Sequence, residues 1–313
     1  MGLITDLTPL NQNTERAAFF ADKSYNPQFR YVREFTVEEL TQYGQPQKAY
    51  FEHAQQMLDT HGAPKKLPGK ILTPAKIATT VLELLHELKL PAIPIHFEHH
   101  RNSQVLMSTQ GIHFRLPIGF TKNKLWGKLN HELQTHYLRR YNQSLQSWDL
   151  KSEKKTPRAF RETEEGLANI HSYIERDDPI MRKTYLNYFA SYLGQQLSFA
   201  ELYHALESYG IREQLAWNLT VKQKRGLEDT SKPGGFSKNH IYFEGLVKVW
   251  QWIAAGNDPK KLYWGRISLE DIEQLDKLEC NQAIIYPTFF ANSDEYREKL
   301  QVIAERNALE KLV

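Results

Sequence analysis

Apolar residues recur at helical spacing over much of the chain, and the clearest helix start lies at Thr73 and Pro74. A Thr side chain can cap free N–H groups, and proline is tolerated in the first turn. The apolar positions that follow share one helical face: Ile77, Val81, Leu84, Leu85 and Leu88. This pattern predicts a helix that runs through Leu90 and stops at Pro91.

Between residues 93 and 116 the apolar period changes to two. Three segments alternate or cluster apolar residues over the length of a strand: residues 93–98, 104–107 and 111–116. They predict a small antiparallel sheet.

Helical spacing returns from Thr121 onward and continues almost to the end of the chain. Four positions lie on one face: Leu125, Leu129, Leu133 and Tyr137. Ser198 and Ser268 each begin a sequence typical of a capping box, and residues 224–239 form a long polar loop. The predicted fold class is therefore α+β, mainly helical, with the small sheet before a helix that starts near Thr121.

The segment before residue 70 contains short predicted helices at residues 37–43 and 47–59. Residues 62–69 are rich in Gly, Pro and Lys, which favours an internal boundary. We expect a helical N-terminal segment, residues 1–69, packed on a main domain of residues 70–313.

Composition excludes several classes of protein. The 313 residues are 41% hydrophobic and 25% charged, with a formal net charge of +3, so neither a membrane nor nucleic acid is an expected partner. A single cysteine, Cys280, excludes an internal disulfide framework and an iron–sulfur site. The first residues lack the basic and apolar regions of a secretion signal, which predicts a cytoplasmic protein. The composition does not indicate an oligomeric state.

The candidate chemistry begins with His131, Glu132 and His136, which form H-E-x-x-x-H. In a regular α-helix two residues five apart are separated by about 140°, so the histidines could not share a metal ion. A single π-turn would restore their alignment, and π-turns are common at functional sites. The alternative is a pair of surface histidines beside an ordinary glutamate.

A possible third ligand follows on another helical segment. Glu164 and Glu165 precede Gly166, and a glutamate on a second helix completes the zinc site in thermolysin-like enzymes. Gly166 would let two helices approach closely. The alternative is a solvated helix start, where acidic residues are favoured.

The run H-E-x-x-T-H-Y-L-R, followed by E-E-G-L-A, resembles the tyrosine/phenylalanine carboxypeptidase family. That family includes the microtubule-associated tyrosine carboxypeptidases and bacterial proteins with a Q-E-G-L-A motif. Further similar pieces lie at residues 25–27, 224–227 and 234–236, and the resemblance extends from about residue 20 to about residue 280. Glu164 replaces the glutamine of the bacterial motif, and Asn239 replaces an expected acidic residue.

The resemblance implies a zincin-like metallopeptidase that removes a C-terminal Tyr or Phe from a peptide or protein. It implies that His131, His136 and Glu165 hold a Zn²⁺ ion with one position open to water. Glu132 would be the general base that takes the proton of that water.

Two further roles have several candidates. Tyr242 or His240 could stabilise the oxyanion, although either could equally belong to the core. Arg225, Lys224 or Arg161 could bind the substrate carboxylate, and Arg225 is the preferred candidate. An ion pair or a solvated surface is the alternative for Arg161.

The strand at residues 111–116 precedes the metal helix, as the edge strand does in zincins, and could bind a peptide by strand addition. The alternative is that it is only a member of the sheet. Four histidines lie near it: His96, His99, His100 and His113. They show no companion carboxylate spacing, so we expect surface or packed histidines and no second metal site.

Two other readings remain open. An aminopeptidase or endopeptidase of the same clan would need an acidic anchor or no anchor. A non-catalytic zinc-containing regulatory protein would have a closed site or a blocked cleft, and Glu132 would have no purpose there. The natural substrate cannot be read from the sequence.

Overall fold

The computed structural model describes residues 3–64, 69–99, 103–275, 277–280 and 283–312. The chain divides into two compact units. Unit 1 comprises Met1–Pro64, Met181–Phe243 and Leu312, and unit 2 comprises Lys65–Ile180 and Glu244–Lys311. The chain first changes unit within the breaker-rich segment at residues 62–69. The predicted second domain differs from unit 2, because residues 181–243 group with unit 1.

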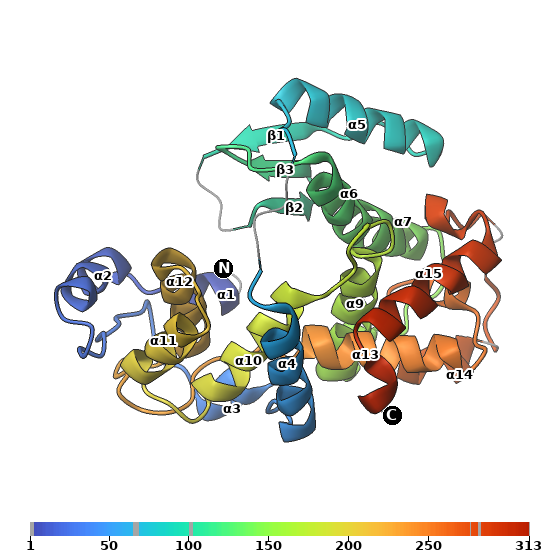
Figure 1. The fold of residues 1–313 in the computed structure, drawn as a ribbon. Coiled ribbons are helices and arrows are strands. Elements are labelled where there is room, and N and C mark those ends of the chain that lie inside the picture. The colour runs from blue at the N-terminus through green and yellow to red at the C-terminus, as the bar shows by residue number, and fades with distance from the viewer. Residues whose placement is uncertain (1–2, 65–68, 100–102, 276, 281–282, 313) are drawn as a thin grey trace. The chain divides into compact units, whose positions relative to one another are not determined.

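Unit 1 is helical in its described residues. Its helices are α1 (Leu3–Asp6), α2 (Gln12–Ala21), α3 (Val37–Thr41), α4 (Lys48–His61), α10 (Arg182–Gly194), α11 (Phe199–Ser208) and α12 (Glu213–Lys224). The predicted helices at residues 37–43 and 47–59 are thus confirmed as α3 and α4. Helices α4 and α10 pack together, with Phe51 stacked on Phe189 and Tyr192 at ring-centroid distances of 5.4 and 4.2 Å (Figure 1).

Unit 2 combines helices with one small sheet (Figure 1). Its longer helices are α5 (Pro74–Glu87), α6 (Lys122–His131), α7 (Leu138–Ser144), α9 (Pro157–His171) and α15 (Ser293–Arg306). Helix α13 (Ile241–Ala254) begins in unit 1 and continues in unit 2. The short helices are η1 (Glu132–Tyr137), α8 (Ser152–Lys155), η2 (Pro259–Tyr263), η3 (Leu269–Asp271), α14 (Ile272–Leu275), η4 (Thr288–Phe290) and η5 (Leu309–Leu312).

Helix α5 begins as the sequence predicts. The Thr73 hydroxyl accepts a hydrogen bond from the backbone N–H of Lys76, and Pro74 is the first helical residue. The predicted apolar stripe is buried throughout. The helix ends at Glu87, three residues earlier than predicted, because Lys89 takes a positive φ of 55°. The predicted capping boxes at Ser198 and Ser268 are also confirmed.

The sheet contains β1 (Ile95–Glu98), β2 (Val105–Ser108) and β3 (Gly111–Arg115) in the order β1–β3–β2 (Figure 1). Strands β2 and β3 form an antiparallel hairpin, but β1 runs parallel to β3, so the expectation of an antiparallel sheet was wrong for one of its two pairings. Alternation identifies strands from their own residues, whereas direction depends on the partner that each strand meets.

Two observations complete the architecture. Leu125, Leu129 and Leu133 are buried as predicted, while Tyr137 is half-buried. Among the described helices, each is too short or too polar to cross a membrane. The structure is therefore mainly helical with a small mixed sheet.

Candidate metal centre

The helix that carries the two histidines contains the predicted irregularity. Helix α6 ends at His131 and continues directly into η1, a π-helix over Glu132–Tyr137. The backbone N–H of Leu138 bonds to the carbonyl of Leu133, five residues earlier. The Thr135 hydroxyl donates a hydrogen bond of 2.7 Å to the backbone carbonyl of Asn130, which also lies five residues earlier. The predicted π-turn is confirmed.

This turn brings three potential ligands together. The Nε2 atoms of His131 and His136 are 3.2 Å apart, and the Glu165 carboxylate lies 3.8 and 3.5 Å from them. Ligands of a tetrahedral zinc ion are separated by about 3.4 Å when the bonds are about 2.1 Å. Both the donor types and their separations therefore fit a zinc ion.

Glu165 lies in the middle of α9 and is only 6% exposed, as its neighbour Glu164 is at 3%. The solvated helix start considered for these two glutamates is therefore wrong. Two buried carboxylates require cationic or hydrogen-bonded partners, because an isolated buried charge is costly.

Glu164 holds the imidazole of His136 in place. Its Oε1 lies 2.9 Å from His136 Nδ1, which leaves Nε2 directed toward the other donors. Its Oε2 accepts a hydrogen bond of 2.5 Å from the fully buried Arg139, which also bonds to the carbonyls of Leu262 and Ile267. Carboxylates that hold the second nitrogen of a ligating histidine fix its tautomer and orientation.

The pKa values of Glu164 and His136 are shifted in the directions that favour a charged pair. Burial favours the neutral form of Glu164, but the nearby Arg139 and His136 outweigh this effect and lower the pKa of Glu164 to about 2. Burial likewise opposes protonation of His136, yet Glu164 and Glu165 raise its pKa to about 10. The carboxylates thus stabilise a positive charge at the point where the donors meet, and a metal cation could replace the proton.

Glu132 lies beside the sheet edge. Its carboxylate accepts a hydrogen bond from the backbone N–H of Met107 in β2, and burial raises its pKa. Strand β2 is an edge of the sheet and contacts η1, whereas β3 is the central strand. Both sides of β3 are already paired, so residues 111–116 are an interior member of the sheet, and peptide binding by strand addition at this strand was wrong.

Gly166 does allow a close helix approach, but its partner is α13 and not the helix of the two histidines. A Cβ on Gly166 would lie 2.2 Å from the carbonyl carbon of Gly245. A Cβ on Gly245 would lie 1.9 Å from the carbonyl oxygen of Glu162. Two glycines therefore permit the contact that supports the middle of α9, where Glu165 lies.

The basic candidates at the end of α12 lie in unit 1. Lys224 is fully buried, and its ammonium bonds to four backbone carbonyls, those of Gly194, Leu197, Lys232 and Gly234. Burial lowers the pKa of Lys224 to about 8. These contacts favour a structural role for Lys224 in holding the glycine loop, while the substrate-binding role stays a prediction.

Arg225 is in a different situation. Burial lowers the pKa of its guanidinium, and its Nε atom is buried without a hydrogen-bond partner among the described residues. Arg161, in unit 2, forms an ion pair with Glu153. Of the three basic candidates, Arg225 has the least compensated charge.

The oxyanion candidates also lie in unit 1. His240 is fully buried, with Nδ1 3.0 Å from the Ser237 hydroxyl and Nε2 3.0 Å from the Tyr43 carbonyl. With both ring nitrogens engaged, His240 is suited to a structural role. Tyr242 is half-buried beneath the Lys238 ammonium, and its catalytic role stays a prediction.

The sheet histidines do have a companion carboxylate, contrary to the expectation from their spacing. His96, Glu98 and His113 offer ligand atoms that all lie within 4.8 Å of one another. Glu98 joins this group because β1 pairs with β3, which spacing within one strand does not reveal. His99 is exposed, and His100 lies outside the described residues.

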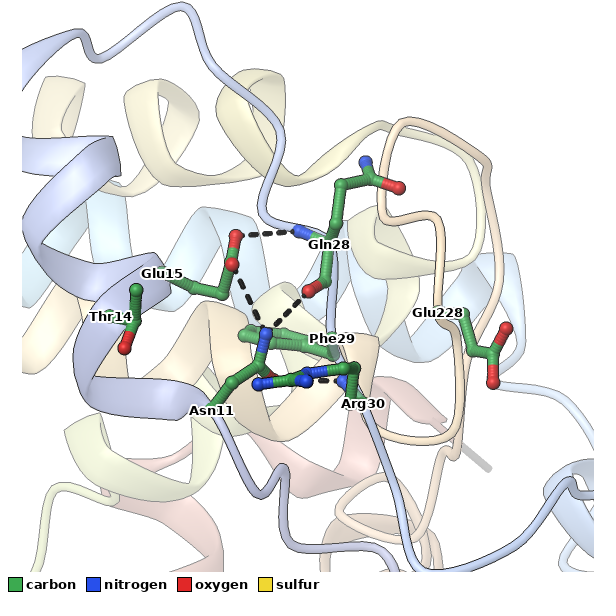
Figure 2. A pocket seen from close by; sticks show the side chains of 7 residues that line it. All are labelled: Asn11, Thr14, Glu15, Gln28, Phe29, Arg30 and Glu228. Atoms are coloured by element: carbon green, nitrogen blue, oxygen red, sulfur yellow. Dashed lines mark hydrogen bonds between the residues drawn. The ribbon is translucent and has the colours of Figure 1, made fainter.

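A surface pocket of about 440 Å³ lies in unit 1 (Figure 2). Figure 2 shows the Glu15 carboxylate bonded to the Asn11 amide and to the backbone N–H of Gln28. None of the predicted site residues lines this pocket. Asn11 also bonds to the backbone of Gln28 and Arg30, so these bonds join helix α2 to the following extended segment.

Arg139 is the main site residue that sequence reasoning missed. It lies three residues after His136, so both can face the same neighbouring helix. That spacing could have indicated a role for Arg139 near the histidines. Its partner Glu164 becomes identifiable only when α9 is packed beside η1.

The structure thus defines a mainly helical protein with a His–His–Glu donor group suited to a transition-metal ion. A sequence model of the microtubule-associated tyrosine carboxypeptidases matches residues 28–308. Microtubule-associated tyrosine carboxypeptidase 1 of Rattus norvegicus is 29% identical over 323 residues, covering 98% of this chain and 69% of the rat protein. The Homo sapiens protein of the same name is 28% identical over 324 residues, with the same coverage. The chain belongs to the microtubule-associated tyrosine carboxypeptidase family.

Proposed function

We propose that this protein is a zinc-dependent, zincin-like carboxypeptidase that releases a C-terminal Tyr or Phe. The observation that carries the proposal is the arrangement of His131, His136 and Glu165 beside Glu132. The family membership supports a peptidase, and the relatives' names support a carboxypeptidase that acts on tyrosine. The substrate partner would be the C-terminus of a peptide or protein.

The three ligand residues would hold the zinc ion through two imidazoles and one carboxylate. When bound, the ion would supply a Lewis acid and an acidified water molecule. Glu132 would accept the proton of that water and deliver it to the leaving amine. Its hydrogen bond from Met107 fixes the carboxylate at the edge of the sheet.

Glu164 and Arg139 would keep the donor atom of His136 aligned through the reaction. Their ion pair is buried, with Arg139 fully covered and the Glu164 side chain 4% exposed. Rearranging it would leave a buried charge without its partner, which is strongly unfavourable. The imidazole is therefore held in one orientation before a metal binds.

An exopeptidase must also recognise a free carboxylate. Arg225 is the preferred anchor, because a partly buried guanidinium with a free Nε atom gains most from an anionic partner. This role rests on the surroundings of Arg225 in unit 1. Tyr242 is kept as the oxyanion donor, and His240 is the weaker candidate.

The alternatives make different demands. An aminopeptidase needs an acidic anchor, and an endopeptidase needs none, so neither uses an arginine. A non-catalytic zinc protein has no use for Glu132 beside the ligands. These alternatives remain outcomes of the experiment.

The experiment uses pairs of peptides that end in Tyr, Phe, Ala or Lys, each as a free acid and as an amide. Mass spectrometry should detect loss of the C-terminal Tyr or Phe from the acids, with far slower cleavage of the amides. The Arg225→Ala variant should raise KM for the acids and change little for the amides. Equal cleavage of acid and amide, or release of the N-terminal residue, would remove this protein from the carboxypeptidases.

A further inference from the structure

A second group of metal-ligand side chains lies on the sheet of unit 2. Within the residues that the structure describes, His96, Glu98 and His113 form one of two such groups, and the other is the candidate centre already described. The donor set is the same in both: two imidazoles and one carboxylate. Such a set suits zinc and related divalent transition metals.

The strand pairing places the three side chains together. His96 lies opposite His113 in the parallel β1–β3 register, and their rings stack with centroids 4.5 Å apart. Glu98 is two residues beyond His96 and so lies on the same face. Phe97 stacks on Phe114 at 5.5 Å on the opposite, apolar face. The polar group is thus confined to one face by the alternation of the strands.

His113 is already oriented by its neighbours. Its Nδ1 lies 3.0 Å from Glu98 Oε1, and its Nε2 lies 2.9 Å from the Ser108 hydroxyl. In metal sites a hydrogen bond to one ring nitrogen commonly fixes the other as the ligand. Ser108 can serve in this way, and a metal ion could then take the place of the contact between His113 Nδ1 and Glu98.

The group is accessible from one side. The His113 side chain is 2% exposed, whereas the Glu98 side chain is 36% exposed. A cation could therefore approach the group from the side of Glu98. Arg115 lies opposite Glu98 in the register, and its positive charge should make binding weaker than at the helical centre.

We propose that His96, Glu98 and His113 form a second binding site for a divalent transition-metal ion, with zinc as the expected ion. The ion would join the four-residue edge strand β1 to the central strand β3 and so stabilise the sheet. This proposal does not depend on the peptidase function. The competing explanation is a polar network that the hydrogen bonds alone complete.

The test begins with a variant that lacks the helical ligands, His131→Ala/Glu165→Ala. Zn²⁺ is titrated into this protein in competition with a chromophoric chelator. We expect one equivalent to remain bound and to raise the Tm. Adding His96→Gln and Glu98→Gln should abolish both effects. If the starting variant does not fold, Glu165→Gln alone provides a milder background.

The matched control is His204→Gln in the same background. His204 Nδ1 lies 3.2 Å from the Glu207 carboxylate on α11, but no third ligand joins them among the described residues. This variant should keep the remaining zinc. Absence of zinc binding in the background variant, or unchanged binding after the His96 and Glu98 substitutions, would overturn the proposal.

The result also separates this site from the proposed catalytic one. His96→Gln/Glu98→Gln in the otherwise natural protein should leave one zinc ion and the peptidase activity in place. If that protein instead loses all its zinc, the sheet site stands and the helical zinc assignment fails.

Discussion

Unit 2 presents the same three donor groups in two settings, once on helices and once on a sheet. In the helical group, His136 is held by a buried carboxylate, Glu164, which Arg139 fixes in turn. In the sheet group, His113 is held by the Ser108 hydroxyl and by Glu98, which is partly exposed. Both groups contain two histidines and one glutamate, so any difference in their function must come from the neighbouring residues.

Two differences point to chemistry in the helical group alone. Glu132 follows its first proposed ligand and accepts a hydrogen bond from β2, so the proposed general base lies next to the donors. The π-helix also interrupts a regular helix to align the histidines, and such irregularities favour functional sites. In the sheet group, Glu98 is itself a proposed ligand, and no further carboxylate is assigned there as the base.

The largest expected effect distinguishes Glu132, beside the helical group, from Glu98 in the sheet group. Glu132→Gln should lower turnover by about 10²- to 10⁴-fold, because an amide cannot accept the proton. Zinc content should remain, since Glu132 is not a proposed ligand. Steady-state hydrolysis of a peptide that ends in Tyr gives the turnover, and Glu98→Gln is the control that should leave it unchanged. A comparable loss in Glu98→Gln would mean that the two groups are not separate in function.

A smaller effect tests the support of His136. Glu164→Ala should weaken zinc binding at the helical group by about 10- to 100-fold, the usual effect of removing a partner of a ligating histidine. Competition with a chelator measures the affinity. Glu164→Gln keeps an acceptor for the imidazole and should lose less. Equal affinity in Glu164→Ala and the natural protein would show that the ion pair with Arg139 does not orient the ligand.

The smallest effect concerns the scaffold of the helical group. Gly166→Ala should destabilise the protein by about 1–3 kcal/mol, because the new methyl group meets the backbone of Gly245. Urea unfolding measures the change. Gly119→Ala is the matched control, since nothing lies within 4 Å of its Cβ position. If the two substitutions cost the same free energy, the close approach of α9 and α13 does not limit stability.

The sequence was most informative where short-range geometry decides the structure. The caps at Thr73, Ser198 and Ser268 and the π-turn all depend on residues within five positions of one another. The spacing of His131 and His136 predicted the irregular turn on the assumption that both bind one metal ion.

Features that depend on distant partners could not be read in this way. Alternation in β1 does not reveal whether its neighbour runs parallel, so Glu98 was not recognised as a companion of His113. The pairing of Arg139 with Glu164 and the contact of Gly166 with Gly245 likewise join separate helices. Such contacts become identifiable only after the elements are packed.

The most direct test removes zinc from the natural protein and then restores it. Zinc content and release of Tyr from a free-acid peptide are measured on the same samples. Release should fall as zinc is removed and return when zinc is restored, while Glu132→Gln should regain zinc at His131, His136 and Glu165 without regaining release. Full release of Tyr by zinc-depleted protein would contradict the proposed metallopeptidase.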